Sequence, residues 1–365
     1  MTERTRVAFV LLDPGFGGGH RHVIDLAKNL SPKIDLAIIG SSLEFLREAK
    51  AAKLATVALP PSRFFGIEDV KPLRQVLVKR NIELIHAHGP RAGWASFFAK
   101  ANLGLPMVYT DHAWNPDYTI RRTRATIQLA GLRLVCRSAD KVIAVSEKAR
   151  QFLVGRGIAK PEKTVIIPNG IDLRLLHGRL ASPKEKSPIV GSVGAFNERK
   201  GHDVFVRAIP AITAKNKRVH FTIIGDGPGR LAVEKLAIEL GVRRFIHFAG
   251  WLPDKERDAH RKRWTIYVQS SRDESFGIAA AEALAMGIPI VATNVGGLPD
   301  VVDGGGMIVE KENPQALAEA VLKLLGNKKM RDRLAKIGSG HVRKNFDLRH
   351  VIHSIQQVYQ QVLES

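Results

Sequence analysis

The sequence predicts an α/β fold made of two doubly wound, parallel-sheet domains. With 365 residues, the chain is longer than one hydrophobic core usually supports, and it suits two domains. In each half, apolar runs of about four to eight residues alternate with helical stretches, a pattern typical of parallel strands covered by helices on both faces. Residues 173–187 separate the two series and are expected to form a linker.

Composition limits the class of protein. The chain is 45% hydrophobic and 25% charged, which is ordinary for a globular protein. Its single cysteine, Cys136, excludes an internal disulfide and fits a reducing compartment. No apolar run approaches the roughly 20 residues that span a bilayer, and the short apolar run at the start is typical of a first strand and not of a signal peptide. We therefore expect a cytoplasmic protein.

Net charge is the unusual property of this sequence. The chain holds 56 Lys and Arg against 35 Asp and Glu, a formal charge of +21 that is spread over both halves. Such a charge attracts polyanions, namely nucleic acid, anionic lipid headgroups or phosphorylated glycans. No nucleic-acid-binding module is recognisable and aromatic residues make up only 6%. The sequence therefore favours nucleic acid least among these partners. Binding of a polyanion by a basic protein stays open as an alternative function.

The first domain is expected over residues 1–172, and it begins with a strand and a glycine-rich loop. The apolar run Val7–Leu12 leads into this loop, which contains Gly17 and Gly18 and precedes a helix. Glycines there let the backbone approach a ligand closely. The loop lacks the G-x-G-x-x-G spacing of dinucleotide sites, because His20 stands at the last position. An NAD site is therefore only weakly indicated.

Three histidines end strands further along this domain. His86 and His88 share one face of a strand and would both reach a metal, but no third ligand has suitable spacing and the chain has no Asp-x-Asp. We therefore expect no metal. His112 follows a later strand, where it faces the crevice at the carboxyl ends of a parallel sheet. Residues 120–137 are rich in arginine and contain no acid, which fits either a surface near a membrane or phosphorylated acceptor, or the solvated face of a scaffold helix.

The second domain is expected over residues 173–346. Its first strand leads to a loop with Arg199 and Lys200, and cations before a helix start suit a diphosphate. The next two strands end at a glycine turn and at a Trp-Leu pair. The residues at these two strand ends are Gly225, Gly227, Trp251 and Leu252. The last helix, at about 347–365, is expected to return to the first domain.

The most informative stretch is Ser270–Gly287, in which Glu274 and Glu282 stand eight residues apart. A strand precedes it and an alanine-rich helix follows, so the unpaired N–H groups at the helix start can hold a phosphate. Glu282, about a turn into the helix, is placed to accept hydrogen bonds from ribose hydroxyls, and Glu274 lies nearer the group that the phosphate carries. The spacing predicts a clamp for a nucleotide sugar. The residues expected at the turn between the two acids are Phe276, Gly277 and Ile278.

This stretch and the following MGIPIVATNVGGLPDVV resemble the donor site of glycosyltransferase family 4, also called glycosyl transferases group 1, of the bacterial surface-polysaccharide type. Glu274 and Glu282 match the E-x7-E pattern of these retaining enzymes, and the resemblance extends over almost the whole chain. It implies the GT-B architecture, in which two Rossmann-like domains face a central cleft. It also implies that a sugar moves from a UDP- or GDP-linked donor to a hydroxyl of a glycan or lipid-linked acceptor, with retention of configuration.

The resemblance further implies roles for individual residues. His112 would lie beside the sugar, Lys200 would neutralise the diphosphate, and Arg199 would replace the arginine that the family usually carries at the position of Ala195. The glycine-rich loop with Gly17 and Gly18 would close over the donor. The turn with Gly225 and Gly227 would lie near the donor, and the backbone near Trp251 would hold the base. No cofactor or metal is expected. With the basic surface, the resemblance favours lipopolysaccharide biosynthesis at the inner face of the plasma membrane, and a sugar-nucleotide isomerase or a phosphorylase on the same scaffold remains a second alternative.

Overall fold

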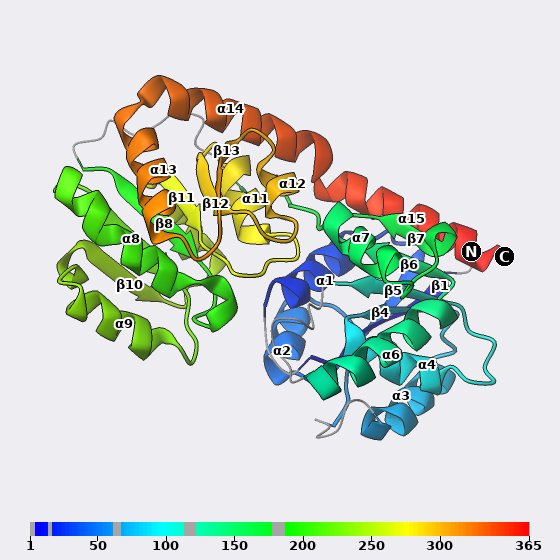
Figure 1. The fold of residues 1–365 in the computed structure, drawn as a ribbon. Coiled ribbons are helices and arrows are strands. Elements are labelled where there is room, and N and C mark those ends of the chain that lie inside the picture. Colours follow the sequence, from blue (N-terminus) through cyan, green and yellow to red (C-terminus); the bar gives the residue numbers. More distant parts are fainter. Residues whose placement is uncertain (1–3, 14–16, 61–66, 113–121, 177–186, 365) are drawn as a thin grey trace. The chain divides into compact units, whose positions relative to one another are not determined.

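The computed structural model describes residues 4–13, 17–60, 67–112, 122–176 and 187–364. It divides into two compact units (Figure 1). The N-terminal unit comprises Met1–Gly170 with Leu348–Ser365, and the C-terminal unit comprises Ile171–Asp347. Each unit is a parallel sheet with its own hydrophobic core, which confirms the predicted α/β class with two Rossmann-like domains. Most of the expected linker, at 177–186, lies outside the described residues.

The N-terminal unit is a seven-stranded parallel sheet in the order β3-β2-β1-β4-β5-β6-β7. The strands are β1 (Thr5–Leu11), β2 (Ile34–Gly40), β3 (Thr56–Ala58), β4 (Leu84–His88), β5 (Met107–Asp111), β6 (Lys141–Ala144) and β7 (Thr164–Ile166). The helices are α1 (Gly18–Asn29), α2 (Leu43–Ala51), α3 (Ile67–Lys79), α4 (Pro90–Ala99), α6 (Arg122–Ser138), α7 (Glu147–Gly155) and α15 (Leu348–Leu363). Every residue of β4 and β5 is buried, including the polar residues His86, His88, Thr110 and Asp111. The strand order reverses between β1 and β4. In open α/β sheets, ligands bind outside the carboxyl ends of the strands at such a reversal, and we call this edge of each sheet the ligand-binding edge.

The C-terminal unit repeats this topology with six parallel strands in the order β10-β9-β8-β11-β12-β13. The strands are β8 (Ile189–Val193), β9 (His220–Ile224), β10 (Ile246–Gly250), β11 (Ile266–Gln269), β12 (Ile290–Thr293) and β13 (Gly306–Val309). The helices are α8 (His202–Lys215), α9 (Arg230–Glu239), α10 (Asp254–Arg261), α11 (Ile278–Ala285), α12 (Leu298–Val302), α13 (Pro314–Gly326) and α14 (Lys328–Asn345). The order reverses between β8 and β11, so the loops after these two strands form the corresponding edge.

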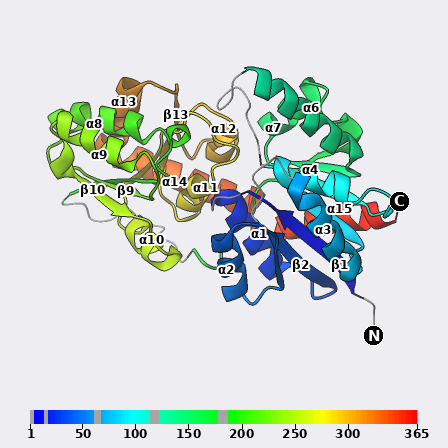
Figure 2. The ribbon, with the colours of Figure 1, turned by 90° about the horizontal axis from the view of Figure 1, so that it is seen from below.

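The last helix belongs to the N-terminal unit although it follows the C-terminal one in sequence. In α15 the apolar residues recur at helical spacing, which gives it one buried face. That face packs on α1, and Figure 2 shows the red helix against the blue N-terminal elements. The buried residues of α15 are Leu348, Val351, Ile352, Ile355, Val358, Tyr359 and Val362.

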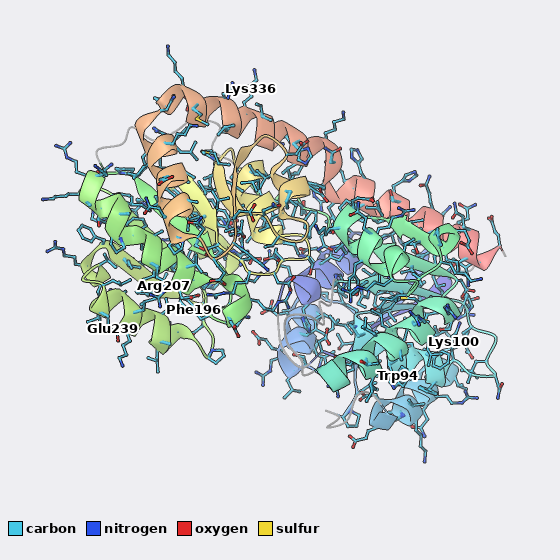
Figure 3. The ribbon with its side chains drawn as sticks, in the orientation of Figure 1. Trp94, Lys100, Phe196, Arg207, Glu239 and Lys336 are labelled. Carbon is cyan, nitrogen blue, oxygen red and sulfur yellow. The ribbon has the colours of Figure 1, made fainter. Side chains whose placement is uncertain are left out.

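The surface of both units carries charged side chains, as the high net charge predicts. Arg207 on α8 and Lys336 on α14, both labelled in Figure 3, are exposed. Among the helices that the structure describes, none is both long enough and apolar enough to cross a bilayer.

Candidate active site

The ligand-binding edge of the N-terminal unit holds a cluster of histidines. His86 and His88 share one face of β4, as predicted, with ring centroids 4.1 Å apart. His112, directly after β5, places Nε2 3.2 Å from Nδ1 of His88. The start of α1 approaches the same point, because a Cβ on Gly19 would lie 3.6 Å from the ring of His112. The structure therefore brings the loop after β1 together with the histidines of β4 and β5.

The glycine-rich loop is described from Gly17 onward, since residues 14–16 lie outside the described part. Gly17 has an extended backbone (φ −165°) and precedes Gly18, the first residue of α1. Within the described part of the chain, nothing lies within 4 Å of the position that a Cβ on Gly17 would take.

Burial keeps this histidine cluster uncharged near neutral pH. The pKa of His112 is lowered to about 4, first by burial and then by the charge of His20 nearby. The pKa of His86 is lowered to about 3, first by burial and then by His112. His86 is also fixed in place, with Nδ1 2.6 Å from the Tyr359 hydroxyl and Nε2 2.7 Å from the Thr110 hydroxyl. At pH 7 these rings therefore act as neutral donors and acceptors of hydrogen bonds.

The ligand-binding edge of the C-terminal unit brings the two predicted cations against two acids. Arg199 and Lys200 form a short turn after β8, and the loop after β11 carries Asp273 and Glu274. Lys200 Nζ lies 2.5 Å from Glu274 Oε2, and Arg199 Nη2 lies 3.0 Å from Asp273 Oδ2. Each cation therefore has a carboxylate partner, and an anionic ligand here would share the cations with those acids.

Glu274 is held by a hydrogen-bond network that starts on β11. The Tyr267 hydroxyl donates to Gln269 Oε1, and Gln269 Nε2 donates to Ser271 Oγ at 2.7 Å and to Glu274 Oε2 at 3.3 Å. The bonds recorded for Glu274 all involve Oε2, and within the described part of the chain Oε1 has no partner. The carboxylate is thus fixed by one oxygen, and the other remains available to a ligand hydroxyl.

The predicted turn before the alanine-rich helix is present at Gly277. Its φ is +98°, a conformation that favours glycine, and a Cβ there would lie 2.6 Å from Leu298 Cδ2, so the tip of that side chain would have to shift. The turn directs the N-terminus of α11, which begins at Ile278, toward the same loop as Glu274. The side chain of Phe276, which the sequence places at the donor site, points into the core. Its ring is buried and packs edge-on against Phe346, with centroids 5.0 Å apart, so only its backbone can contact a ligand.

Glu282 lies on the second turn of α11 and pairs with an arginine that the sequence did not single out. Arg261, at the end of α10, is fully buried and places Nη2 2.5 Å from Glu282 Oε2. Its Nη1 lies 2.9 Å from Asp258 Oδ1. Burial lowers the pKa of this guanidinium, but the charges of Glu282 and Asp258 raise it more, and the net pKa is raised. Arg261 therefore stays charged and fixes the Glu282 carboxylate in one orientation.

The remaining predicted residues lie in the neighbouring loops at the same edge of the sheet. Gly225 follows β9 with φ +139°, and a Cβ there would lie 1.9 Å from the Gly194 carbonyl oxygen, so only glycine allows this close approach of the two loops. Gly227 follows in the same turn, where its N–H donates to Asp226 Oδ1. After β10, Trp251 is 57% exposed and Leu252 is half-buried. All four loops after β8, β9, β10 and β11 thus carry predicted site residues.

Arg272 is a second residue that sequence reasoning missed. Its guanidinium holds both carboxylate oxygens of Asp203, at 2.7 and 2.6 Å, which ties the loop of Glu274 to the start of α8. In the sequence, the only indication of this role was that Arg272 is a charged residue next to Asp273. Among the described residues, no group of three His, Cys, Asp or Glu side chains is placed to hold a metal ion.

Two protein families match this chain, one for each half. Residues 16–175 match the family described as Glycosyltransferase Family 4, and residues 179–341 match the family described as Glycosyl transferases group 1. The chain carries both domains of a group 1 glycosyltransferase. The two matches together span most of the sequence, and each falls on one Rossmann-like sheet.

Relatives with known sequences agree with these family matches. An uncharacterized glycosyltransferase of Methanocaldococcus jannaschii is 27% identical over 358 residues, covering 96% of both chains. The D-inositol 3-phosphate glycosyltransferase of Thermobispora bispora is also 27% identical, covering 77% of this chain and 71% of its own. The crystal structure of Anabaena HepE with UDP and glucose matches with a TM-score of 0.85 at 20% identity, covering 98% of this chain and all of HepE. At that identity, HepE supports the GT-B fold alone.

Proposed function

We propose that this glycosyltransferase moves a sugar from a UDP-linked donor, bound at the carboxyl edge of the C-terminal sheet, to an acceptor hydroxyl with retention of configuration. One observation carries the proposal. The Lys200–Glu274 pair, the N-terminus of α11 and the fixed Glu282 carboxylate come together where the strand order of the sheet reverses. Cations, helix amides and carboxylates at one point are the groups needed for a diphosphate joined to two polyhydroxylated rings.

Each group has a chemical task in this proposal. The diphosphate gains negative charge as it leaves, and Lys200, Arg199 and the amides at the start of α11 stabilise that charge. Lys200 has three N–H donors, so it can keep its bond to Glu274 while it contacts a phosphate oxygen. Glu274 accepts a bond from a sugar hydroxyl through Oε1, and Glu282 accepts from the ribose. His112 lies beside the reacting centre as a neutral hydrogen-bonding group.

We propose UDP as the first nucleotide to test, because HepE, which has the same fold, contains UDP and glucose in its crystal structure, and GDP is the second. For the acceptor we propose a hydroxyl of a phosphate-bearing molecule, because the chain has a net charge of +21 and one relative is a D-inositol 3-phosphate glycosyltransferase. A lipid-linked glycan at the inner face of the plasma membrane, in cell-surface polysaccharide or lipopolysaccharide synthesis, is the form that we expect in a bacterium. No metal is needed in this scheme.

A thermal-shift screen tests the donor proposal. The purified chain is mixed at high salt with UDP, GDP, ADP and their sugars, and a ligand that binds the native state raises the melting temperature. Glu274→Gln keeps the size of the side chain and removes its charge, so it should weaken the response to the UDP-sugar. Glu319→Gln is the matched control, because Glu319 is exposed on α13 and, among the described residues, its carboxylate accepts a hydrogen bond only from Gln315.

Stabilisation by UDP-sugars that is lost in Glu274→Gln and kept in Glu319→Gln supports the proposal. If no nucleotide raises the melting temperature and the chain binds DNA in a salt-sensitive way, the donor proposal is wrong and the polyanion-binding alternative is favoured. If the UDP-sugar is consumed without any acceptor, mass spectrometry of the products separates isomerisation of the donor from its hydrolysis.

A further inference from the structure

The C-terminal unit contains a cavity at the edge of the sheet opposite the proposed donor site. It has a volume of about 500 Å3 and lies at the amino ends of β8, β9 and β10, where Ile189, His220 and Ile246 begin these strands. The donor residues follow the carboxyl ends of the same strands. Five-residue strands separate the two edges by on the order of 15 Å, so one small ligand cannot occupy both.

The lining of this cavity is basic. Of the described residues, twelve line it and none of these is acidic. The rings of His247 on β10 and His260 on α10 stack with centroids 5.8 Å apart and planes 15° apart (Figure 2 shows both elements). The guanidinium carbon of Arg244 lies over the Phe245 ring, 5.0 Å from its centroid.

The basic groups of the cavity lack anionic partners. Among the described residues, four of these side chains form neither an ion pair nor a hydrogen bond. They are His220, Arg244, His247 and Arg263. The pKa of His260 is lowered, first by burial and then by the positive charges of His247 and Arg263, while Glu256 on its own helix opposes this shift. The positively charged side chains of the cavity therefore repel one another, and an anion bound there would reduce this repulsion.

We propose that this cavity binds a phosphate-bearing small molecule, with Arg244 and Arg263 as the main charged contacts and the paired imidazoles of His247 and His260 as additional donors. Arginine suits phosphate because its planar N–H groups can bind two oxygens at once. The cavity volume falls within the range of about 300–1,000 Å3 that is typical of small-molecule sites, so an organic phosphate fits better than the free ion. The half-buried Phe245 ring offers an apolar wall for the organic part.

The test follows the imidazole proton signals of His247 and His260 by NMR during titration with inorganic phosphate and with glycerol 3-phosphate at constant ionic strength. Single His→Gln variants assign the signals. We expect saturable shifts of both signals, tighter binding of glycerol 3-phosphate than of phosphate, and affinity at least about tenfold weaker in Arg244→Ala/Arg263→Ala. Arg207→Ala/Arg333→Ala removes two exposed arginines of the same unit and is the charge-matched control.

Three results would overturn this proposal. The first is the absence of a saturable shift in the wild-type chain. The second is equal weakening in the two double-arginine variants, which would reduce the effect to diffuse attraction by a basic surface. The third is binding of phosphatidylglycerol vesicles, measured by pelleting and lost in Arg244→Ala/Arg263→Ala, with no response to the soluble phosphates. Lys200→Met changes the proposed donor site and should keep the phosphate-induced shifts of the His247 and His260 signals. Failure of the donor-site proposal and failure of the cavity proposal are therefore separate outcomes.

Discussion

The buried pair of Arg261 and Glu282 allows a quantitative prediction about the C-terminal unit. Glu282→Ala leaves a fully buried guanidinium with Asp258 as its remaining close acidic partner at 2.9 Å. Removal of one member of a buried ion pair typically costs about 3–5 kcal/mol in the free energy of unfolding. Because Asp258 retains part of the compensation, we expect about 3 kcal/mol for Glu282→Ala.

A double-mutant cycle separates this electrostatic effect from loss of packing. Arg261→Met removes the charge at similar volume and leaves Glu282 with Arg257, whose Nη2 lies 3.9 Å from Glu282 Oε1. The variant that combines Arg261→Met with Glu282→Ala no longer contains the unpaired charge. We therefore expect it to be more stable than the sum of the single changes predicts, with a coupling free energy of about 1–3 kcal/mol.

The assay is equilibrium urea unfolding, combined with hydrogen exchange of peptides from α10 and α11. Hydrogen exchange is needed because the chain has two units, and a single global transition would mix their stabilities. If the two changes add to within about 0.5 kcal/mol, Arg261 and Glu282 do not act as a pair, and the reasoning that Arg261 fixes the carboxylate proposed to bind the ribose is wrong.

Three further predictions concern the donor site and the histidine cluster. Lys200→Met should lower the affinity for UDP at least about tenfold in isothermal titration, since it removes a charge-assisted contact, and Lys235→Ala, at an exposed lysine of α9, should not. Gly277→Ala should destabilise the C-terminal unit by about 1–3 kcal/mol, because the backbone has φ +98°, whereas Gly326→Ala, where nothing would contact the new Cβ, should be neutral in urea unfolding. The folded pKa of His86, about 3, lies below the ordinary value of 6.5, so its contribution to stability is present above pH 6.5 and is lost as the pH falls toward 3. Calorimetry should show a melting temperature that falls from pH 6.5 to 4, with a smaller fall in His86→Gln; an equal fall would show that His86 does not carry this dependence.

Much of the fold follows from local sequence patterns. The continuous apolar run of β1 and the alanine-rich run of α11 predict a buried strand and a helix, because burial of a strand on both faces favours apolar residues throughout. The spacing of Glu274 and Glu282 predicted that both acids lie at one edge of a sheet. The structure places them there, and their roles toward a sugar and a ribose stay a prediction.

The parts that the sequence did not predict depend on contacts between distant segments. Arg261 precedes Glu282 by 21 positions on a different helix, and no periodic pattern connects them. The Tyr359 hydroxyl reaches His86 across 273 positions, so the fixed orientation of that ring was not visible in the sequence. Phe276 was placed at the donor site because it precedes Gly277, but an aromatic ring next to a helix start can also pack into the core, and here it does so against Phe346.

Hydrogen exchange of the whole chain with and without UDP tests the central claim most directly. We predict that UDP slows exchange in peptides covering residues 194–202 and 270–282, where the loops after β8 and β11 meet. Lys200→Met should abolish this protection at the same UDP concentration. Protection confined to other segments, or no protection at a UDP concentration that saturates a measured binding curve, would contradict the assignment of the donor site.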